Sequence, residues 1–204
     1  LPQADALDES HRLAPINPYA SSKASVERAL AAAAWRGLRA ASLRYFNASG
    51  ADASGLIGEA HDPETHLIPL AIDAALGLRP CLVVHGSDYP TEDGSCVRDY
   101  VHVTDLADAH LRAVRWLLLQ GKSGRHDAFN LGSGIGYSVK QVVDCVGRLA
   151  GQPVPHVFGA RRPGDSPRLV GAISKAQEQL GWLPQRGLET QIEDALRWRR
   201  ALMR

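Results

Sequence analysis

Residues 17–47 read NPYASSKASVERALAAAAWRGLRAASLRYFN, a helix-forming run followed directly by a strand-forming run. Pro18 suits the first turn of a helix, alanine is the strongest helix former, and Gly37 is typical of a helix end. The apolar, β-prone residues 38–46 then predict a buried strand. A helix that leads straight into a buried strand indicates an α/β protein.

The same alternation continues along the rest of the chain. Hydrophobic periodicity predicts helices over residues 19–35, 68–76, 104–119, 139–150, 174–180 and 188–202, and strands over 38–46, 81–85, 97–103, 128–131 and 154–158. Thr104, Ser138 and Ser174 are expected to cap three of these helices, because their hydroxyls can accept an unpaired backbone N–H. Residues 1–18, 47–66, 86–95 and 161–169 are predicted as loops, since they are rich in polar residues, glycine or proline.

Composition narrows the class of protein. The chain has 204 residues, 45% of them hydrophobic and 22% charged, with a net charge of +1. This balance excludes a disordered chain and gives no basic excess for nucleic acid or a membrane surface. Its apolar runs are too short to cross a bilayer, its acidic start lacks a signal segment, and its three cysteines form no CxxC. We therefore expect a cytoplasmic protein that binds neither nucleic acid nor membrane.

The start of the sequence gives one further expectation. The chain begins at Leu1 and its only methionine is Met203. We therefore expect it to derive from a longer polypeptide by processing or truncation.

Two features of the opening helix and strand suggest chemistry. Tyr19 and Lys23 are four residues apart, so on a helix they share one face, and the ammonium group favours the phenolate form of the tyrosine. A phenolate is a general base for a hydroxyl proton, whereas the alternative is an ordinary surface pair. Asn47 follows the strand, at the edge of the sheet where ligands bind in open α/β folds, or else it simply makes a turn.

Two arginine-containing segments suggest recognition of phosphate. Arg98 and Asp99 lie in a strand-like segment, where Arg98 could bind phosphate or the two could form a structural ion pair. Arg161 and Arg162 lie on a tight turn that ends at Asp165, a set that suits a diphosphate and sugar hydroxyls. The alternative for this turn is a solvated polar loop.

Two other segments contain ligand-type residues without suitable spacing. The glycine-rich residues 130–136 lack the spacing of a dinucleotide fingerprint, so a packing turn is the better interpretation. His61, Asp62, Glu64 and His66 could suggest a metal site, but they lie irregularly in a loop and no cysteine joins them. We therefore expect no metal site.

Taken together and in this order, these segments resemble the extended short-chain dehydrogenase/reductase family, and in particular its NAD-dependent sugar-nucleotide epimerases and dehydratases. The resembling stretches are residues 17–23, 43–50, 58–69, 86–109, 129–134, 161–165 and 180–182. The runs over 58–69 and 88–105 are the most specific because they are the longest.

The resemblance implies a two-part architecture. Residues 1–50 would be the C-terminal part of an NAD-binding Rossmann domain, the remnant of its parallel sheet. Residues 51–204 would form mainly a smaller α/β domain for a UDP-sugar, with some segments returning to the Rossmann sheet. The family's glycine-rich NAD loop and its catalytic serine or threonine have no counterpart in this sequence. We therefore expect this polypeptide alone to bind NAD poorly and not to turn over.

The resemblance also implies roles for individual residues. Tyr19 would deprotonate the sugar 4-hydroxyl, Lys23 would assist it and bond the nicotinamide ribose, and Phe46 would lie near the nicotinamide. The remaining implied positions bind the UDP-sugar: Asn47, His66, Leu67, Val83 and His85 line its site, Arg98 and Arg162 bind the diphosphate, Asp165 binds the uridine ribose, and Leu169 replaces a large aromatic found in some members.

The implied reaction is the interconversion of UDP-glucose and UDP-galactose through transient oxidation at C4, with NAD as cofactor and a homodimer for the full-length enzyme. Leu169 and His66, which stands where some members have asparagine, leave other sugars open. The alternatives are an epimerase for UDP-pentoses or UDP-N-acetylhexosamines, and a non-catalytic module that binds UDP-sugars.

Overall fold

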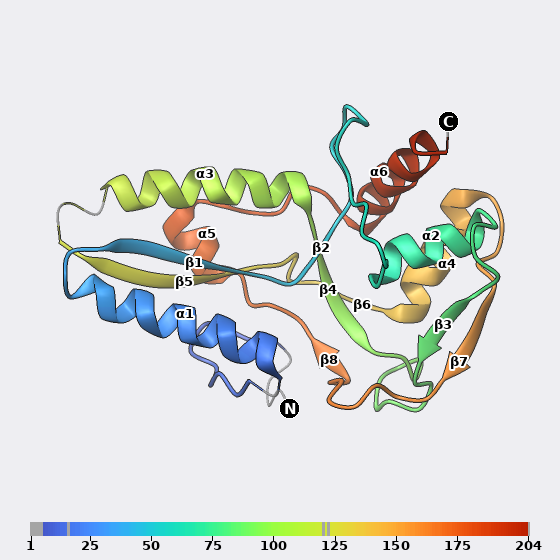
Figure 1. Ribbon diagram of the computed structural model, residues 1–204, viewed down its shortest axis with the longest axis horizontal. Coiled ribbons are helices and arrows are strands. Elements are labelled where there is room, and N and C mark those ends of the chain that lie inside the picture. The colour runs from blue at the N-terminus through green and yellow to red at the C-terminus, as the bar shows by residue number, and fades with distance from the viewer. Residues whose placement is uncertain (1–5, 16, 120, 122, 204) are drawn as a thin grey trace.

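The computed structural model describes residues 6–15, 17–119, 121 and 123–203 (Figure 1). The predicted loop over residues 1–18 lies partly outside these ranges. The elements in chain order are α1 (Pro18–Ala34), β1 (Arg39–Tyr45), β2 (Asn47–Ser49), α2 (Leu67–Ala75), β3 (Leu82–His85), β4 (Val97–His102), α3 (Val103–Leu119), β5 (Arg125–Leu131), β6 (Gly136–Ser138), α4 (Val139–Ala150), β7 (His156–Gly159), β8 (Arg168–Leu169), α5 (Ser174–Leu180) and α6 (Leu188–Ala201).

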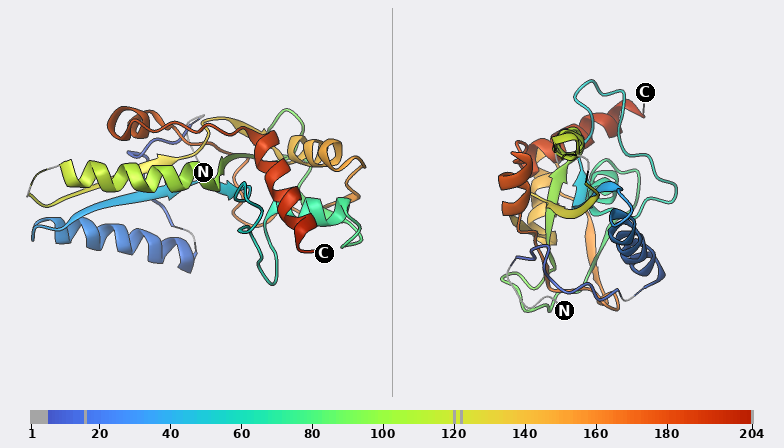
Figure 2. Two further views of the ribbon diagram at one scale, coloured as in Figure 1. Left: turned by 90° about the horizontal axis from the view of Figure 1, so that it is seen from above. Right: turned by 90° about the vertical axis from the view of Figure 1, so that its left-hand side faces the viewer.

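One half of the molecule is built around the parallel pair β1 and β5, in which Leu43 lies opposite Phe129. Helix α1 covers one face of this pair, and α3 with α5 covers the other (Figure 2). The core on the α3 side contains Trp116, Phe129 and Trp182, whereas Ala24 is the buried residue of α1. The expected α/β fold with parallel strands is confirmed.

The other half is built around β4. Strand β2 pairs with it in parallel, β6 pairs antiparallel and β8 pairs parallel, while β3 and β7 form a separate parallel pair. Helices α2, α4 and α6 pack against one another over a second core that includes Ile72, Val146 and Ile192. Within the described residues, every helix is too short or too polar to cross a membrane.

The structure corrects the sequence-based expectations at several element boundaries. The predicted loop over 47–66 begins with β2, and the predicted loop over 161–169 ends in β8. Both strands are short, and their strand conformation comes from pairing with β4 rather than from a local hydrophobic pattern. Strand β6 was not predicted for the same reason.

The three expected helix caps have different outcomes. Ser138 caps α4 and forms a capping box with Gln141, as predicted. Thr104 and Ser174 do not cap their helices, because both already lie inside them. The backbone N–H of Thr104 instead donates to Nδ1 of His102, over 3.0 Å.

His102 joins β4 to the C-terminal helix in the interior of the protein. Its Nδ1 accepts from Thr104, so Nε2 carries the proton and donates to the carboxylate of Asp194, over 3.1 Å. Its ring lies against Gly50, where an added Cβ would come within 2.6 Å of the imidazole. Burial lowers the pKa of His102, so the folded protein holds this imidazole neutral.

This buried imidazole makes stability depend on pH. The pKa of His102 is lower in the folded chain than in the unfolded chain, so the unfolded chain binds the extra proton below about pH 6.5. The free energy of unfolding should therefore decrease as the pH is lowered through that range, by up to about 1.4 kcal/mol per pH unit for this proton. His102→Gln should lower stability at about pH 7.5 by about 1–3 kcal/mol and flatten the pH dependence.

Urea unfolding at about pH 7.5 and about pH 5.5 measures both effects. His156→Gln, at an exposed histidine of β7, is the control and should keep the wild-type pH dependence. An undiminished pH dependence in His102→Gln would contradict the assignment.

Candidate functional site

A cavity of about 700 Å³ lies beside β2, at the ends of α2, α3 and α6. Its volume is in the range of small-molecule sites. Four of the predicted site residues line it together: Phe46, Asn47, His66 and Leu67. The structure therefore brings residues 46–47 and residues 66–67 together, two segments that the sequence connects only through the family resemblance.

Phe46 and Asn47 lie at the junction of β1 and β2. The backbone N–H of Phe46 donates to the carbonyl of Leu131, and its ring lies so close to Gly171 that an added Cβ there would come within 2.3 Å of the ring. The side-chain amide of Asn47 donates to the carbonyl of Asp99, over 2.7 Å. These contacts hold both side chains at the carboxyl end of β1, where open α/β folds bind ligands.

Tyr19 and Lys23 lie together in the first turns of α1. The Nζ atom of Lys23 is 5.3 Å from the centre of the Tyr19 ring, and Tyr19 is 73% exposed. Asn17 caps the helix by accepting from the N–H of Ala20, over 2.8 Å, which fixes where the helix begins. The predicted juxtaposition of phenol and ammonium is present on the surface of this helix.

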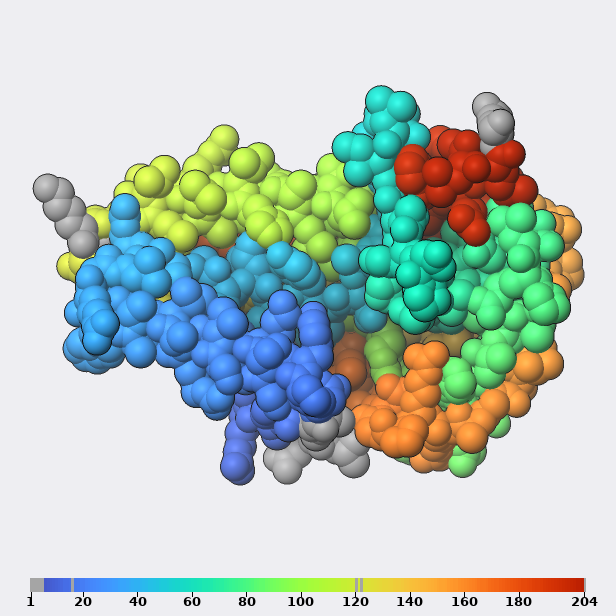
Figure 3. Space-filling view, in the orientation of Figure 1, coloured from blue at the N-terminus to red at the C-terminus, as the bar shows by residue number. Residues whose placement is uncertain are grey.

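A hollow separates α1 from the opposite half of the molecule in Figure 3. The blue atoms of α1 lie on one side, and the teal atoms that precede α2 and the orange atoms around β7 lie on the other. Atoms in the colours of β4 and β8 are visible at its floor. Several of the elements that carry predicted catalytic and substrate-binding residues thus border one depression.

Arg98 on β4 interacts with the segment before β8. Its guanidinium donates to Asp165, over 3.2 Å, and to the carbonyl of Ser166, over 2.7 Å. In the register of β4 and β8, Arg98 lies opposite Leu169. The alternative of an Arg98–Asp99 ion pair is therefore wrong, because the two side chains have different partners.

Asp99 is fully buried, and its carboxylate binds backbone N–H groups. It accepts from Ser133, over 2.6 Å, from Gly134, over 3.1 Å, and from Gly171, over 3.1 Å. A Cβ at Gly132 would come within 2.3 Å of the carboxylate, so the close approach requires glycine. Burial raises the pKa of Asp99, although these hydrogen bonds oppose the shift. The glycine-rich loop is thus a packing turn, as predicted, and two of its N–H groups bind this carboxylate.

The turn after β7 presents the second arginine segment. Arg161 lies over the ring of Tyr89, 4.4 Å from its centre, and its Nε donates to Asp88 over 2.7 Å. The side chain of Arg162 is exposed, and its carbonyl accepts from the N–H of Asp165 within the turn. The structure therefore separates the two arginines, with Arg161 bound to its neighbours and Arg162 facing solvent.

Strand β3 carries the last two predicted positions. Val83 and His85 alternate with the buried Leu82 and Val84, so they share the more exposed face of the strand. Nδ1 of His85 lies 3.2 Å from the carbonyl of Ala160, next to the turn that carries the arginines. These positions adjoin the arginine turn, whereas the cavity is lined by other residues.

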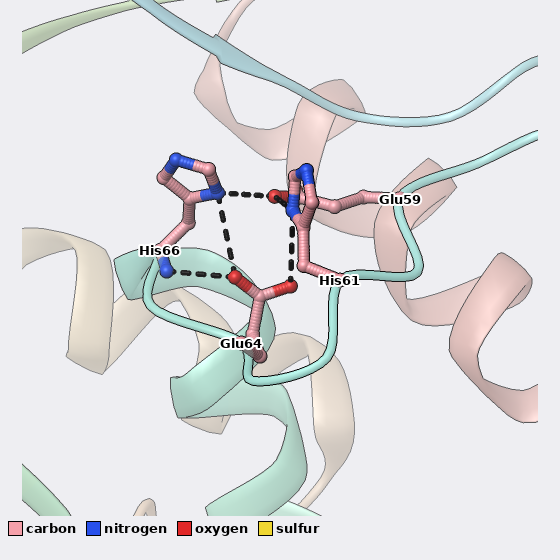
Figure 4. A group of neighbouring side chains, drawn as sticks. All are labelled: Glu59, His61, Glu64 and His66. Atoms are coloured by element: carbon pink, nitrogen blue, oxygen red, sulfur yellow. Dashed lines mark hydrogen bonds and ion pairs between the residues drawn. The ribbon is translucent and has the colours of Figure 1, made fainter. Parts of the chain in front are cut away.

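The loop before α2 brings together four possible metal ligands. Glu59, His61, Glu64 and His66 form one group, and Asp62, which the sequence analysis considered, lies outside it (Figure 4). Three members of the group, Glu59, His61 and His66, also line the cavity.

Comparison with known proteins identifies the family. The family described as GDP-mannose 4,6 dehydratase matches residues 1–195. The chain belongs to this NAD-dependent epimerase/dehydratase family.

Relatives within the family are homologous along nearly the whole chain. UDP-glucose 4-epimerase of Rhizobium leguminosarum bv. trifolii is 54% identical over 199 residues, which is 97% of this chain and 60% of the relative. The structure of UDP-glucose 4-epimerase from Brucella ovis in complex with NAD is 47% identical in sequence and superposes with a TM-score of 0.90. The match covers 96% of this chain and 60% of the Brucella chain.

A third comparison extends to another bound ligand. This is the structure of UDP-glucose-4-epimerase from Stenotrophomonas maltophila with bound NAD and formylated UDP-arabinopyranose, which has a TM-score of 0.94 and 38% sequence identity. The match covers 99% of this chain and 60% of the Stenotrophomonas chain. The chain thus spans about 60% of the length of the relatives it matches. The predicted family and the homology to isomerases are confirmed.

For this family member, the sequence analysis missed the part of the cavity wall that α6 provides. The indole of Trp198 donates to the carbonyl of Glu59, over 2.8 Å, and its ring packs on Gly58. Tyr100 is buried beside the same cavity, and burial raises its pKa. These positions are brought together by tertiary packing, for which a single sequence has no local pattern.

The buried carboxylate of Asp99 generates a stability prediction. Asp99→Ala leaves the N–H groups of Ser133, Gly134 and Gly171 without this acceptor, so we expect a loss of about 3 kcal/mol or more. Asp99→Asn, which keeps one acceptor oxygen, should fall between wild type and Asp99→Ala. Urea unfolding at neutral pH measures the losses.

Asp108→Ala is the control, because this exposed residue pairs with Arg112 on the surface of α3. It should change the free energy of unfolding by no more than about 0.5 kcal/mol. An equally small effect of Asp99→Ala would mean that the carboxylate does not organise these segments.

Proposed function

We propose that the protein carrying this chain is an NAD-dependent epimerase that interconverts UDP-glucose and UDP-galactose. The observation that carries the proposal is the Tyr19–Lys23 pair on α1, with the ammonium 5.3 Å from the centre of the phenol ring. Homology to UDP-glucose 4-epimerases supports the sugar nucleotide as substrate. The proposal concerns the whole protein, because this chain spans only about 60% of the length of the relatives that it matches.

The described residues fit one end of the cofactor. Lys23 and Tyr19 present an ammonium and a hydroxyl on exposed positions of α1, where they would hold the nicotinamide ribose, and Phe46 contributes an aromatic ring to the wall of the cavity. NAD, when bound, supplies reversible hydride transfer at the sugar C4. The glycine-rich loop contributes no open phosphate cradle, because Ser133 and Gly134 donate their N–H groups to Asp99.

The tyrosine handles the proton in both directions. The phenolate of Tyr19 takes the proton of the 4-hydroxyl group, and it returns the same proton to the oxygen after the sugar has presented its other face. Lys23 places a positive charge beside the ring of this tyrosine. The proton balance is therefore zero over one turnover.

The substrate is proposed to extend from the cavity to the arginine turn. Asn47, His66 and Leu67 line the sugar end, since all three face the cavity. At the other end, Arg162 offers an exposed guanidinium to the diphosphate.

Arg98 and its neighbours complete the nucleotide end. Arg98 donates a hydrogen bond to Asp165 and so orients this carboxylate, which would bind the uridine ribose. Val83 and His85 form the adjoining wall.

Leu169 supports a second candidate substrate. It lies opposite Arg98 in the register of β4 and β8, and by resemblance it stands where some members of the family carry a large aromatic that limits the size of the sugar. A smaller side chain leaves room for an N-acetyl group, so UDP-N-acetylhexosamines are the second candidate. Comparing kcat/KM for UDP-glucose and UDP-N-acetylglucosamine decides between them.

The role of Tyr19 is tested in the protein expressed from the complete reading frame that contains this chain. Tyr19→Phe should lower kcat by about 10²-fold or more, because the base is removed, while the Kd for UDP-glucose stays within about threefold. Tyr45→Phe is the control, since this tyrosine hydroxyl bonds His110 on α3. Unchanged turnover in Tyr19→Phe would remove this residue as the base.

The diphosphate contact is tested by calorimetry with UDP. Arg162→Ala should weaken UDP binding about tenfold or more without changing stability, because its side chain is exposed in the free protein. Arg36→Ala, at an exposed position after α1, should bind UDP as the wild type does. Equal affinity in both variants would show that Arg162 makes no diphosphate contact.

A further inference from the structure

The loop between β2 and α2 folds back so that four side chains face one another. Glu59, His61, Glu64 and His66 lie within eight residues of sequence, and one potential ligand atom from each lies within 4.8 Å of all the others. Figure 4 shows the two imidazole rings with their Nδ1 atoms turned toward the carboxylates.

The separations within this group suit a shared ion. Nδ1 of His61 is 2.9 Å from Oε1 of Glu59 and 3.7 Å from Oε2 of Glu64, and Nδ1 of His66 is 3.3 Å from Oε1 of Glu64. Nδ1 of His66 also contacts Glu59. Four ligands placed tetrahedrally at about 2.0–2.1 Å from a zinc ion lie about 3.3–3.4 Å from one another. The four side chains are therefore close enough to share one ion after small rotations, since one ligand atom from each lies within 4.8 Å of the others.

Further hydrogen bonds hold the carboxylate of Glu64 and the backbone of Glu59 in place. Oε1 of Glu64 accepts from the backbone N–H groups of Thr65, over 2.7 Å, and His66, over 2.8 Å. The carbonyl of Glu59 accepts from the indole of Trp198. The side chains of Glu59 and Glu64 are 20% and 14% exposed, while both imidazoles are 58% exposed. The carboxylates are thus partly withdrawn from water, and the imidazoles leave an approach for an ion.

Charge balance is compatible with one divalent ion at this group. Two carboxylates carry two negative charges, and unprotonated imidazoles contribute none while offering a lone pair on Nδ1. One divalent cation neutralises the set and uses all four ligands. Two imidazoles and two carboxylates suit zinc and related transition metals better than magnesium or calcium, which prefer oxygen ligands.

We propose that Glu59, His61, Glu64 and His66 bind one divalent transition-metal ion, with Zn²⁺ the best fit. The ion would cross-link the loop that forms one wall of the cavity and fix its connection to α2. This role is structural, and it does not depend on the proposed epimerase activity. The irregular spacing that argued against a metal site in the sequence is compatible with one, because the folded loop, rather than a periodic element, places the ligands.

The test is calorimetric titration of the purified protein with Zn²⁺ after treatment with a chelator. We expect one ion per chain, and at least tenfold weaker binding in His61→Ala and in Glu64→Gln. Glu64→Gln is nearly isosteric and keeps an oxygen for the N–H groups of Thr65 and His66. Asp62→Asn is the matched control from the same loop, outside the group, and should bind Zn²⁺ as the wild type does. Wild-type affinity in both cluster variants, or no stoichiometric binding, would overturn the proposal.

A second measurement needs no substitution. In protein labelled with ¹⁵N-histidine, Zn²⁺ should shift the Nδ1 resonances of His61 and His66 at one equivalent, while the resonances of the exposed His156 stay unchanged. Shifts spread over exposed histidines, with none specific to His61 and His66, would indicate adventitious surface binding and overturn the proposal.

Discussion

The buried carboxylate of Asp99 is the interaction on which the arrangement of the site depends. Its oxygens accept N–H groups from the loop after β5 and from Gly171 after β8, and its backbone carbonyl accepts the amide of Asn47. A carboxylate removed from water is unfavourable unless such donors surround it, so the three segments are constrained together. Gly171 in turn is the surface on which Phe46 packs. Phe46 therefore packs on a segment that the buried carboxylate holds, and Asn47 is held by the backbone carbonyl of the same residue.

Short-range features could be predicted from the sequence because their physics is local. The Tyr19–Lys23 contact follows from the helical repeat, and the Ser138 cap follows from the need to satisfy the first N–H groups of α4. The glycine-rich loop was correctly assigned to packing because its spacing fits no dinucleotide motif. The parallel α/β class followed from the order of helices and strands.

Contacts that depend on long-range register could not be predicted in the same way. Arg98 lies beside Asp99 in sequence but bonds Asp165, because the side chains of adjacent strand residues point to opposite faces. Strands β2 and β8 exist through their pairing with β4. The group around His61 and His66 depends on how a loop folds back on itself, which hydrophobic periodicity does not describe.

The indole of Trp198 gives the last helix a second role. Besides packing on the core, α6 reaches across to hold Gly58 and Glu59, so the helix near the C-terminus and the loop before α2 share one hydrogen bond and one packed ring. Local opening of either element must break the contact that supports the other, and the two then exchange with solvent as one cooperative unit. A molecule bound in the cavity between them would raise the free energy of that opening. Binding in the cavity would therefore also stabilise α6 against local unfolding, without any hinge motion.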